Sequence, residues 1–399
     1  MTYNFDQIVD RRDTNAVKLD VYKEYIFHTK DIELPYEEDE LIHLWIADME
    51  FAVADEILDA IRKRLDRQIL GYTTNSDSRL YDALNLWCKK RYDFTFDQKE
   101  LVISAGVVPA ITKIIGYTVK EGEKVLFNTP SYSQFANASI KNDREYITSD
   151  LIKDEKGFYT IDFEDLEEKM KREDTKLFIL CNPHNPTGRA WSRKELEKLA
   201  ELIKKYDLWV ISDEIHCDLR RKDTEKHIPF AKIMGDYDKL VTCMAASKSF
   251  NIAGLAESSI LIRSEKLREK WNMDNKNRVN PLSHEATIAA YTKAGQWLDE
   301  LNDYLDKNFA LLDEYLGENL EKAIVTPSQT TYLAWVDLRN YFGEDEDIEL
   351  FLGKNAGVLI EADKAFVGNA DRMIRINLAC PSAYLKEGLC RMAKAINNK

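Results

Sequence analysis

Lys248 is the residue around which the candidate chemistry of this sequence is arranged. The apolar run 240–246 comes just before it and predicts a buried strand, so the lysine stands close to that strand's end. Burial disfavours the charged ammonium and lowers the pKa of a lysine. Such an amine can act as a nucleophile or base, or form an imine with a carbonyl cofactor. A plain surface lysine is the competing interpretation, and other positions must decide between the two.

Polar residues also follow another apolar run, 208–212. Asp213 comes directly after it, where a buried carboxylate needs several hydrogen bonds or a cation such as a protonated pyridine nitrogen. A helix N-cap is the alternative role. His216 is either a neighbour of a ring oxygen or a satisfied core histidine.

Three further strand ends carry candidate ligands for a planar, phosphorylated group. After 101–104, small Ala105 and Gly106 lead into a helix whose free N–H groups would attract a phosphate. Tyr132, after 124–128, could stack on a ring. After 177–181 comes a dense turn, 182–188, in which Asn185 could donate to a ring oxygen and an X–Pro bond can be cis. Plain turns and a half-buried core tyrosine are the alternatives.

Arg375 lies in the alternating segment 373–378, with apolar residues on the other face. The planar fork of an arginine in mid-strand suits a carboxylate. A structural ion pair with a local acid is equally compatible with the pattern.

The elements that must position these residues alternate between strand and helix. We predict strands at 101–104, 124–128, 177–181, 208–212, 240–246 and 259–262, and helices at 109–118, 163–171 and 193–206. Buried strands separated by helices indicate a mainly parallel sheet covered on both faces, with ligands beyond the carboxyl ends of the strands.

The pattern changes after about residue 285. A long amphipathic stretch, 285–321, predicts one helix or a pair, and 332–336, 373–378 and a closing helix at 386–396 follow. Two domains are expected, a large one spanning 48–287 and a small α+β one formed by 1–47 together with 288–399.

Composition narrows the class of protein. In 399 residues, 56 Lys and Arg stand against 70 Asp and Glu, and a net charge of −14 disfavours nucleic acid as a partner. No stretch of 18 apolar residues predicts a membrane span, and the start lacks the pattern of a signal peptide. Six scattered cysteines without CxxC spacing indicate free thiols, no metal site and a cytoplasmic location.

Together these residues resemble fold-type I pyridoxal 5′-phosphate (PLP) enzymes, the aspartate aminotransferase superfamily. The resemblance covers nearly the whole chain and rests on four motifs in family order: His184-Asn185-Pro186-Thr187-Gly188, Asp213-Glu214-Ile215-His216, Ser247-Lys248-Ser249-Phe250 and Arg375. It implies a three-layer α/β/α transferase fold, with a mainly parallel seven-stranded sheet in the large domain and a smaller α+β domain.

Further segments look like the cystathionine β-lyase and cystalysin-like C–S β-lyase branch. They are 5–12, 45–51, 71–73, 106–109, 227–230, 247–255 and 377–381. Ala256, eight residues after the lysine, stands where many aminotransferases of this fold type carry a phosphate-binding arginine. The resemblance implies elimination from cystathionine- or cysteine-type substrates to pyruvate, ammonia and a thiol.

The resemblance also implies a role for each site residue. Lys248 would form the internal aldimine and then act as the base, and Arg375 would bind the substrate carboxylate. Tyr72 would reach the phosphate of the partner's site in a homodimer with shared active sites, and it joins Lys248 and Tyr132 as a catalytic residue. The remaining cofactor contacts would be Asp213 at the pyridine nitrogen, Asn185 and His216 at the ring oxygen, Tyr132 on the ring, and Gly106, Val107, Val108 and Ser247 at the phosphate.

Three places depart from that branch: Ser133-Gln134, Thr330 and the basic loop 220–223. The first two fall near the expected substrate pocket and leave the choice of substrate open. Two other functions remain open from the residues, a PLP-dependent aminotransferase that shares every residue named, and a catalytically silent regulatory binding protein.

Overall fold

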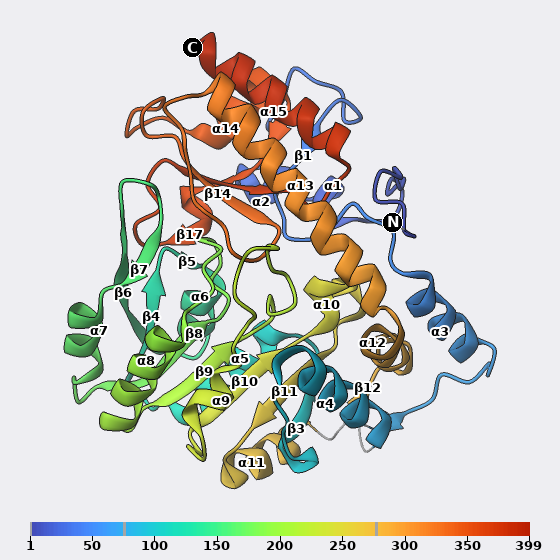
Figure 1. The fold of residues 1–399 in the computed structure, drawn as a ribbon, viewed down its shortest axis with the longest axis vertical. Helices are drawn as coiled ribbons and strands as arrows, with labels where there is room; N and C mark the ends of the chain where they lie inside the picture. Colours follow the sequence, from blue (N-terminus) through green and yellow to red (C-terminus); the bar gives the residue numbers. More distant parts are fainter. Residues whose placement is uncertain (1, 75–76, 276–277) are drawn as a thin grey trace.

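A large mixed sheet lies at the centre of the molecule. The computed structural model describes residues 2–74, 77–275 and 278–399 (Figure 1). Eight strands follow the order β3-β11-β10-β9-β8-β4-β6-β7. From β10 to β6 the neighbours are parallel, whereas β11 runs antiparallel to β10 and β3, and β7 antiparallel to β6. Their bounds are β3 Leu101–Ser104, β11 Ser258–Ile262, β10 Leu240–Met244, β9 Trp209–Asp213, β8 Thr175–Cys181, β4 Lys124–Thr129, β6 Glu145–Lys153 and β7 Tyr159–Ile161.

Both faces of this sheet are buried under helices. Along β8, Leu177 and Ile179 belong to one core, whereas Phe178 and Leu180 belong to the other, since successive side chains point to opposite faces. The first core also holds residues of α5, α6 and α11, and the second holds residues of α3, α4, α7, α8, α9 and α12. The three-layer α/β/α arrangement is therefore confirmed. The helices are α3 Asp55–Leu65, α4 Ser78–Tyr92, α5 Val107–Thr118, α6 Gln134–Ile140, α7 Phe163–Met170, α8 Arg193–Lys205, α9 Phe230–Met234, α10 Ala246–Ser249, α11 Glu265–Asn275 and α12 Pro281–Lys293.

A smaller antiparallel sheet, in the order β13-β14-β18-β16, lies in the upper part of Figure 1 with α14 and α15. The N-terminal strand β1 joins this region by pairing in parallel with β15. The antiparallel pair formed by β5 and β17 links the two regions. The bounds are α1 Val17–Asp20, α2 Tyr22–Ile26, β1 Ile42–His43, β2 Thr73–Thr74, β5 Ser131–Tyr132, β12 Arg278–Val279, β13 Ile324–Val325, β14 Leu333–Asp337, α14 Ile348–Ala356, β15 Val358–Leu359, β16 Glu361–Ala362, β17 Phe366–Val367, β18 Met373–Asn377 and α15 Ser382–Asn397.

The long helix α13 (Gly295–Asn319) connects the two regions. Its first half, including Trp297 and Leu301, packs in the core of the large sheet. Its second half, including Phe309 and Leu312, packs in the core of the small sheet. The proposed division into 48–287 and 1–47 with 288–399 stays a prediction.

The sequence-based boundaries agree with the structure to within a few residues, with two differences. The sheet has eight strands instead of seven, because the short β7 pairs with the edge strand β6. Neither strand was predicted, since 145–153 mixes polar and apolar residues without clean alternation. The strand 240–246 ends at Met244, and Ala246 already begins α10. The stretch 285–321 is a pair of helices, α12 and α13. Within the described residues, no helix is both long and apolar enough to cross a bilayer.

Candidate active site

The predicted site residues follow strands that end at one edge of the large sheet. In the strand register, Asp213 at the end of β9 lies between Cys181 of β8 and Cys243 of β10. On the other side of β10 lies the antiparallel β11. Its Ser259 pairs with Met244 of β10, and the preceding Ser258 pairs with Ser104 of β3. The ends of β8, β9, β10 and β3 are therefore level, which brings the segments that follow them to the same edge.

Lys248 is the third residue of α10, close after β10, and is half-buried. Its Nζ donates a hydrogen bond to the carbonyl oxygen of Ala47 at 2.6 Å. Burial, with the positive charge of Arg375, lowers the pKa of Lys248 to about 8, against the opposing effect of nearby carboxylates that include Asp213. A substantial part of this lysine is thus the neutral amine near pH 8, the form that acts as nucleophile or base.

Asp213 is buried with little compensation for its charge. Burial raises the pKa of Asp213 to about 7, and the neighbouring charge of Glu214 adds to the effect. Within the described parts of the chain, the one hydrogen bond to its carboxylate comes from the N–H of Ile215, 3.2 Å from Oδ1. A cationic ring nitrogen placed here would supply the missing partner and favour the ionised form.

The start of α5 is a ready anion site. Gly106 is the N-cap and offers no side chain to the helix. Pro109 has no N–H, and the N–H of Ala110 already bonds the oxygen of Gly106 at 3.2 Å. Among the residues that the structure describes, none accepts from the N–H groups of Val107 and Val108, which therefore remain for an anion. A Cβ on Gly106 would lie 3.2 Å from Cδ of Pro109, so glycine gives this turn its room.

Ser247 comes directly before Lys248 in α10 and is half-buried. Because the ends of β3 and β10 are level, α10 and the start of α5 leave the sheet at the same edge. The predicted role of the Ser247 hydroxyl at a phosphate is compatible with that position and stays a prediction.

Asn185 lies in the loop between β8 and α8, in which Asn182–Pro183 and Asn185–Pro186 are cis. Its Oδ1 accepts a hydrogen bond from Nη1 of Arg375 at 3.0 Å, so its Nδ2 is the atom left to donate. Within the same loop His184 is structural, since its Nδ1 lies 2.8 Å from Oγ1 of Thr187. The amide of Asn185 therefore links the large sheet to the arginine of the small one.

His216 and Tyr132 complete the buried polar group. Burial, together with the positive charges of Lys248 and Arg375, lowers the pKa of His216 to about 3, which keeps the ring neutral. Nδ1 of His216 has no hydrogen-bond partner among the described residues. Burial raises the pKa of Tyr132, which keeps the phenol protonated. An unsatisfied buried ring nitrogen indicates that a polar group belongs beside it.

Arg375 is held in the middle of β18, between Glu361 of β16 and Trp335 of β14. Its Nη2 forms an ion pair with Glu361, and both side chains are 3% exposed. The structural ion pair with a local acid is therefore present, Arg375 also contacts Asn185, and the binding of a carboxylate by this arginine stays a prediction. Its Nε has no hydrogen-bond partner among the described residues.

The segment 45–51 lies over Lys248 and is fixed from several sides. The hydroxyl of Tyr332 donates to the same Ala47 oxygen at 2.9 Å. Asn251 bonds both the N–H and the oxygen of Met49 and the oxygen of Phe51, at 2.9–3.1 Å. These contacts hold the acceptor of Lys248 in place.

Tyr72 is the predicted site residue that the structure does not bring to this group. It is 92% exposed, whereas the other site residues are buried or half-buried. Its predicted place in the site of a partner subunit is untested.

Thr330 has a structural role. Its N–H and its Oγ1 both donate to the oxygen of Gly188 at 3.0 Å, which ties 328–331 to the loop that carries Asn185. Gly188 has φ +67°, and a Cβ there would collide with Ser328. Thr330, one of the three departures from the expected sequence, thus stabilises the loop that carries Asn185.

Sequence reasoning missed Glu361 and the carbonyl of Ala47. A signal for Glu361 does exist, because it is the one acid in the apolar run 358–362, just as Arg375 is the one base in 373–376. No residue type marks a backbone acceptor such as Ala47.

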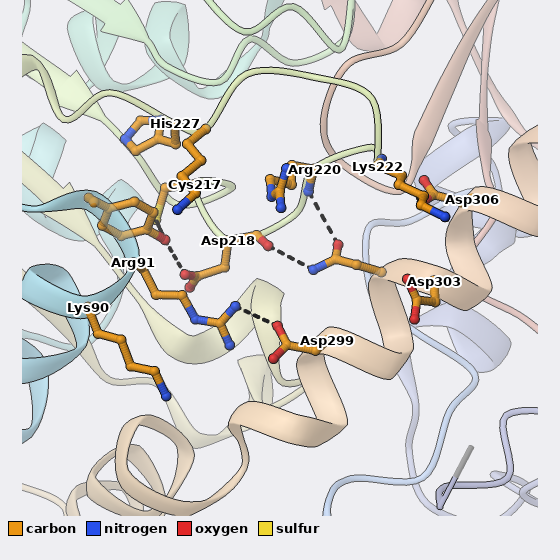
Figure 2. Close-up of a pocket in the computed structure, with 13 residues that line it drawn as sticks. Lys90, Arg91, Cys217, Asp218, Arg220, Lys222, His227, Asp299, Asp303 and Asp306 are labelled. Atoms are coloured by element: carbon orange, nitrogen blue, oxygen red, sulfur yellow. Dashed lines mark hydrogen bonds and ion pairs between the residues drawn. The ribbon is translucent and has the colours of Figure 1, made fainter.

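A separate cavity of about 410 Å³ lies between α4, the segment 217–227 and α13 (Figure 2). None of the predicted site residues lines it. Asp218 forms part of its wall and accepts hydrogen bonds from Trp87, Tyr92 and Ser249. Arg91 and Asp299, which also line it, form a direct ion pair, as Figure 2 shows. This cavity is therefore separate from the group of predicted site residues at the edge of the large sheet.

Comparison with known proteins gives consistent results. The family model described as aminotransferase class I and II matches residues 39–392. A cystathionine beta-lyase of Bacillus subtilis, PatB, is 36% identical over 99% of this chain and 100% of its own. The PLP-bound C-S lyase from Staphylococcus hominis shares 46% identity with a TM-score of 0.94, covering 99% of this chain and 98% of that one. Cystalysin from Treponema denticola, whose structure contains pyridoxal 5′-phosphate, shares 31% identity with a TM-score of 0.93 over the full length of both chains.

Proposed function

This chain belongs to the class I and II aminotransferase family, and on that premise we propose that it is a PLP-dependent carbon–sulfur β-lyase. The observation that carries the proposal is the match, over 99% of the chain and at 46% identity, to a C-S lyase. The reaction is the cleavage of a cystathionine- or cysteine-type amino acid to a thiol or sulfide, pyruvate and ammonia.

The residues at the sheet edge fit the cofactor. Asp213 is a buried carboxylate that needs a cation, which a pyridinium nitrogen would be. The free N–H groups of Val107 and Val108 suit a phosphate, and Ser247 would add a hydroxyl. Nδ2 of Asn185 and the unsatisfied Nδ1 of His216 suit a ring oxygen.

Two further residues would complete the cofactor site. Tyr132 would pack on the ring, and Lys248 offers the amine that an aldehyde requires. When bound, PLP supplies that aldehyde and an electron-withdrawing ring that stabilises negative charge at the substrate Cα.

The chain's own groups would then control charge and protons. Arg375 would hold the substrate α-carboxylate and so fix the orientation of Cα. The neutral Nζ of Lys248 would take the proton from Cα, since its lowered pKa leaves it largely unprotonated at mildly alkaline pH. The carboxylate of Asp213 would keep a proton on the ring nitrogen.

One assay separates this function from that of an aminotransferase, which would use the same residues. The purified holoprotein is incubated with L-cystathionine, L-cysteine and S-methyl-L-cysteine, with and without a 2-oxo acid acceptor. Pyruvate and thiol formed without acceptor support the lyase. A new amino acid formed only with acceptor would identify an aminotransferase, and a protein that binds PLP without turnover would be a regulatory binder.

A homodimer and a cytoplasmic location belong to the same proposal. Ile69, Leu70 and Tyr72 are 72%, 57% and 92% exposed, a run of large apolar surface that supports a partner there. All six cysteines are free thiols, which supports a reducing compartment. Sedimentation of the holoprotein tests the dimer.

A further inference from the structure

Glu361 faces the arginine that would bind the substrate. It is the direct neighbour of Arg375 in the pairing of β16 with β18. Its carboxylate accepts from Nη2 of Arg375, and the exposure of each side chain is 3%. The cation assigned to the substrate carboxylate is thus already paired with a carboxylate of the chain.

The guanidinium of Arg375 has five N–H donors. Nη1 donates to Oδ1 of Asn185 at 3.0 Å, Nη2 donates to Glu361, and Nε is buried without a partner among the described residues. The ring of Phe366 covers the guanidinium, with its centroid 5.1 Å from Cζ. Donors therefore remain for an incoming carboxylate, but the charge of the guanidinium is compensated before it arrives.

Tyr25, in α2, lies close enough to Glu361 for the two groups to interact. Burial, together with the charge of Glu361, raises the pKa of the Tyr25 phenol. The Tyr25 ring packs on Trp45, with centroids 4.9 Å apart, in the segment that carries Ala47. The hydroxyl of Tyr25 is therefore a nearby donor for the Glu361 carboxylate once that carboxylate moves away from Arg375.

We propose that Glu361 is an internal competitor for Arg375 and sets the affinity of the site for the α-carboxylate of the substrate. Two carboxylates on one guanidinium repel each other, so an incoming carboxylate must displace Glu361 towards Tyr25 or bind beside it at a cost. Glu361 then acts through Arg375 as a positioning residue that sets the affinity for the substrate. The inference rests on the role that the proposed function gives to Arg375.

The test uses the holoenzyme and 3-(methylthio)propionate, a carboxylate that lacks the amino group and cannot react. Its dissociation constant is measured by calorimetry, alongside KM and kcat for L-cystathionine. Glu361→Gln keeps the shape of the side chain and removes its charge. We expect the dissociation constant and KM to fall about tenfold, with kcat within about twofold of wild type, because the change affects binding of the carboxylate.

Three further variants make the test specific. Glu349→Gln replaces another buried acid of the same region, which accepts from the N–H of Ala362. Burial raises the pKa of Glu349 to about 8, so this comparison is made at pH 9, where Glu349 is ionised, and the substitution should leave both constants unchanged. In an Arg375→Ala background, Glu361→Gln should have no effect on the dissociation constant. If Glu361→Gln does not fold, Glu361→Asp, which shortens the reach of the carboxylate, should lower the constant about threefold.

Opposite results would overturn the inference. A dissociation constant that stays the same or rises in Glu361→Gln would make Glu361 a structural support of Arg375. An equal fall in Glu349→Gln would indicate a general charge effect. If no variant forms pyruvate but the constant falls as expected, the lyase function fails and the competition at Arg375 stands.

Discussion

The Nζ of Lys248 lies 2.6 Å from the carbonyl oxygen of Ala47, a residue 201 positions earlier in the chain. That oxygen also accepts from Tyr332, so three distant segments converge on one backbone atom. The orientation of the Lys248 side chain is thus set by the N-terminal part of the chain as well as by the strand that precedes the lysine. Substitutions in either part should therefore change the rate of the reaction.

Lys248→Ala should abolish turnover, with a loss of at least about 10³-fold in kcat, because both the nucleophile and the base are removed. The measurement is pyruvate formation from L-cystathionine together with the visible absorbance of bound cofactor. Lys18→Met is the matched control, since Lys18 is a buried lysine paired with Glu50 at 2.7 Å. It should lower the melting temperature and leave the absorbance band of the cofactor intact. Retained turnover in Lys248→Ala would contradict the assignment.

Asp213→Asn should weaken cofactor binding and lower kcat by about 10²-fold or more, because an amide cannot hold the ring nitrogen protonated. The pKa of Asp213 is raised to about 7 in the cofactor-free protein, so the acid must ionise on binding. Cofactor affinity should therefore weaken in wild type as pH falls below about 7, by more than in Asp213→Asn. Titration of the cofactor-free proteins between pH 5.5 and 8 checks this, with Asp306→Asn as the control. Identical pH profiles for wild type and Asp213→Asn would refute it.

Arg375→Ala should raise KM for L-cystathionine by about 10²-fold, whereas Arg375→Lys should raise it less, since a lysine keeps the charge but not the planar fork. The alanine variant leaves Glu361 buried without its cation and should also melt earlier. Steady-state kinetics and thermal melts measure the two effects separately. A fall in kcat without a change in KM would argue against carboxylate binding.

Tyr72→Ala and Lys248→Ala should complement each other if Tyr72 acts in the partner's site. A mixed dimer then contains one site with both residues intact, and random pairing restores about a quarter of the wild-type sites. Each variant is assayed alone and after co-expression with the other. If Tyr72 acted within its own chain, no mixed dimer would contain an intact site, and activity would stay at the level of the single variants.

Glu349→Gln should stabilise the protein at high pH. Burial raises the pKa of Glu349 to about 8, so the folded state holds a proton that the unfolded chain releases near pH 4.5. Wild type therefore loses stability as pH rises from about 4.5 to 8, and glutamine, which does not titrate, does not. The gain should be small at pH 5 and on the order of 5 kcal/mol at pH 9. Urea unfolding at both values measures it, and equal gains at the two would disprove the titration.

Much of this site can be predicted from the positions of the strand ends in the sequence. Asp213, Asn185 and Lys248 each come at or soon after the end of a buried apolar run, and parallel strands bring such positions to one edge. Contacts between distant segments could not be predicted. The pairing of Glu361 with Arg375 depends on strands that sequence periodicity could not detect, since β16 has only two residues. Ala47 could not be predicted either, because it contributes only a backbone oxygen and every residue has one.

The pairing of Ile42 with Val358 joins parts of the chain that are synthesised at very different times. A chain leaving the ribosome exposes β1 long before its partner strand exists, and Arg375 emerges later still. The cofactor-binding edge of the large sheet is complete earlier, because its last strand ends at Ile262. Nascent chains thus pass through a stage that has the lysine but not the arginine, and the proposed binding of the substrate carboxylate can begin only after residue 375 has been translated.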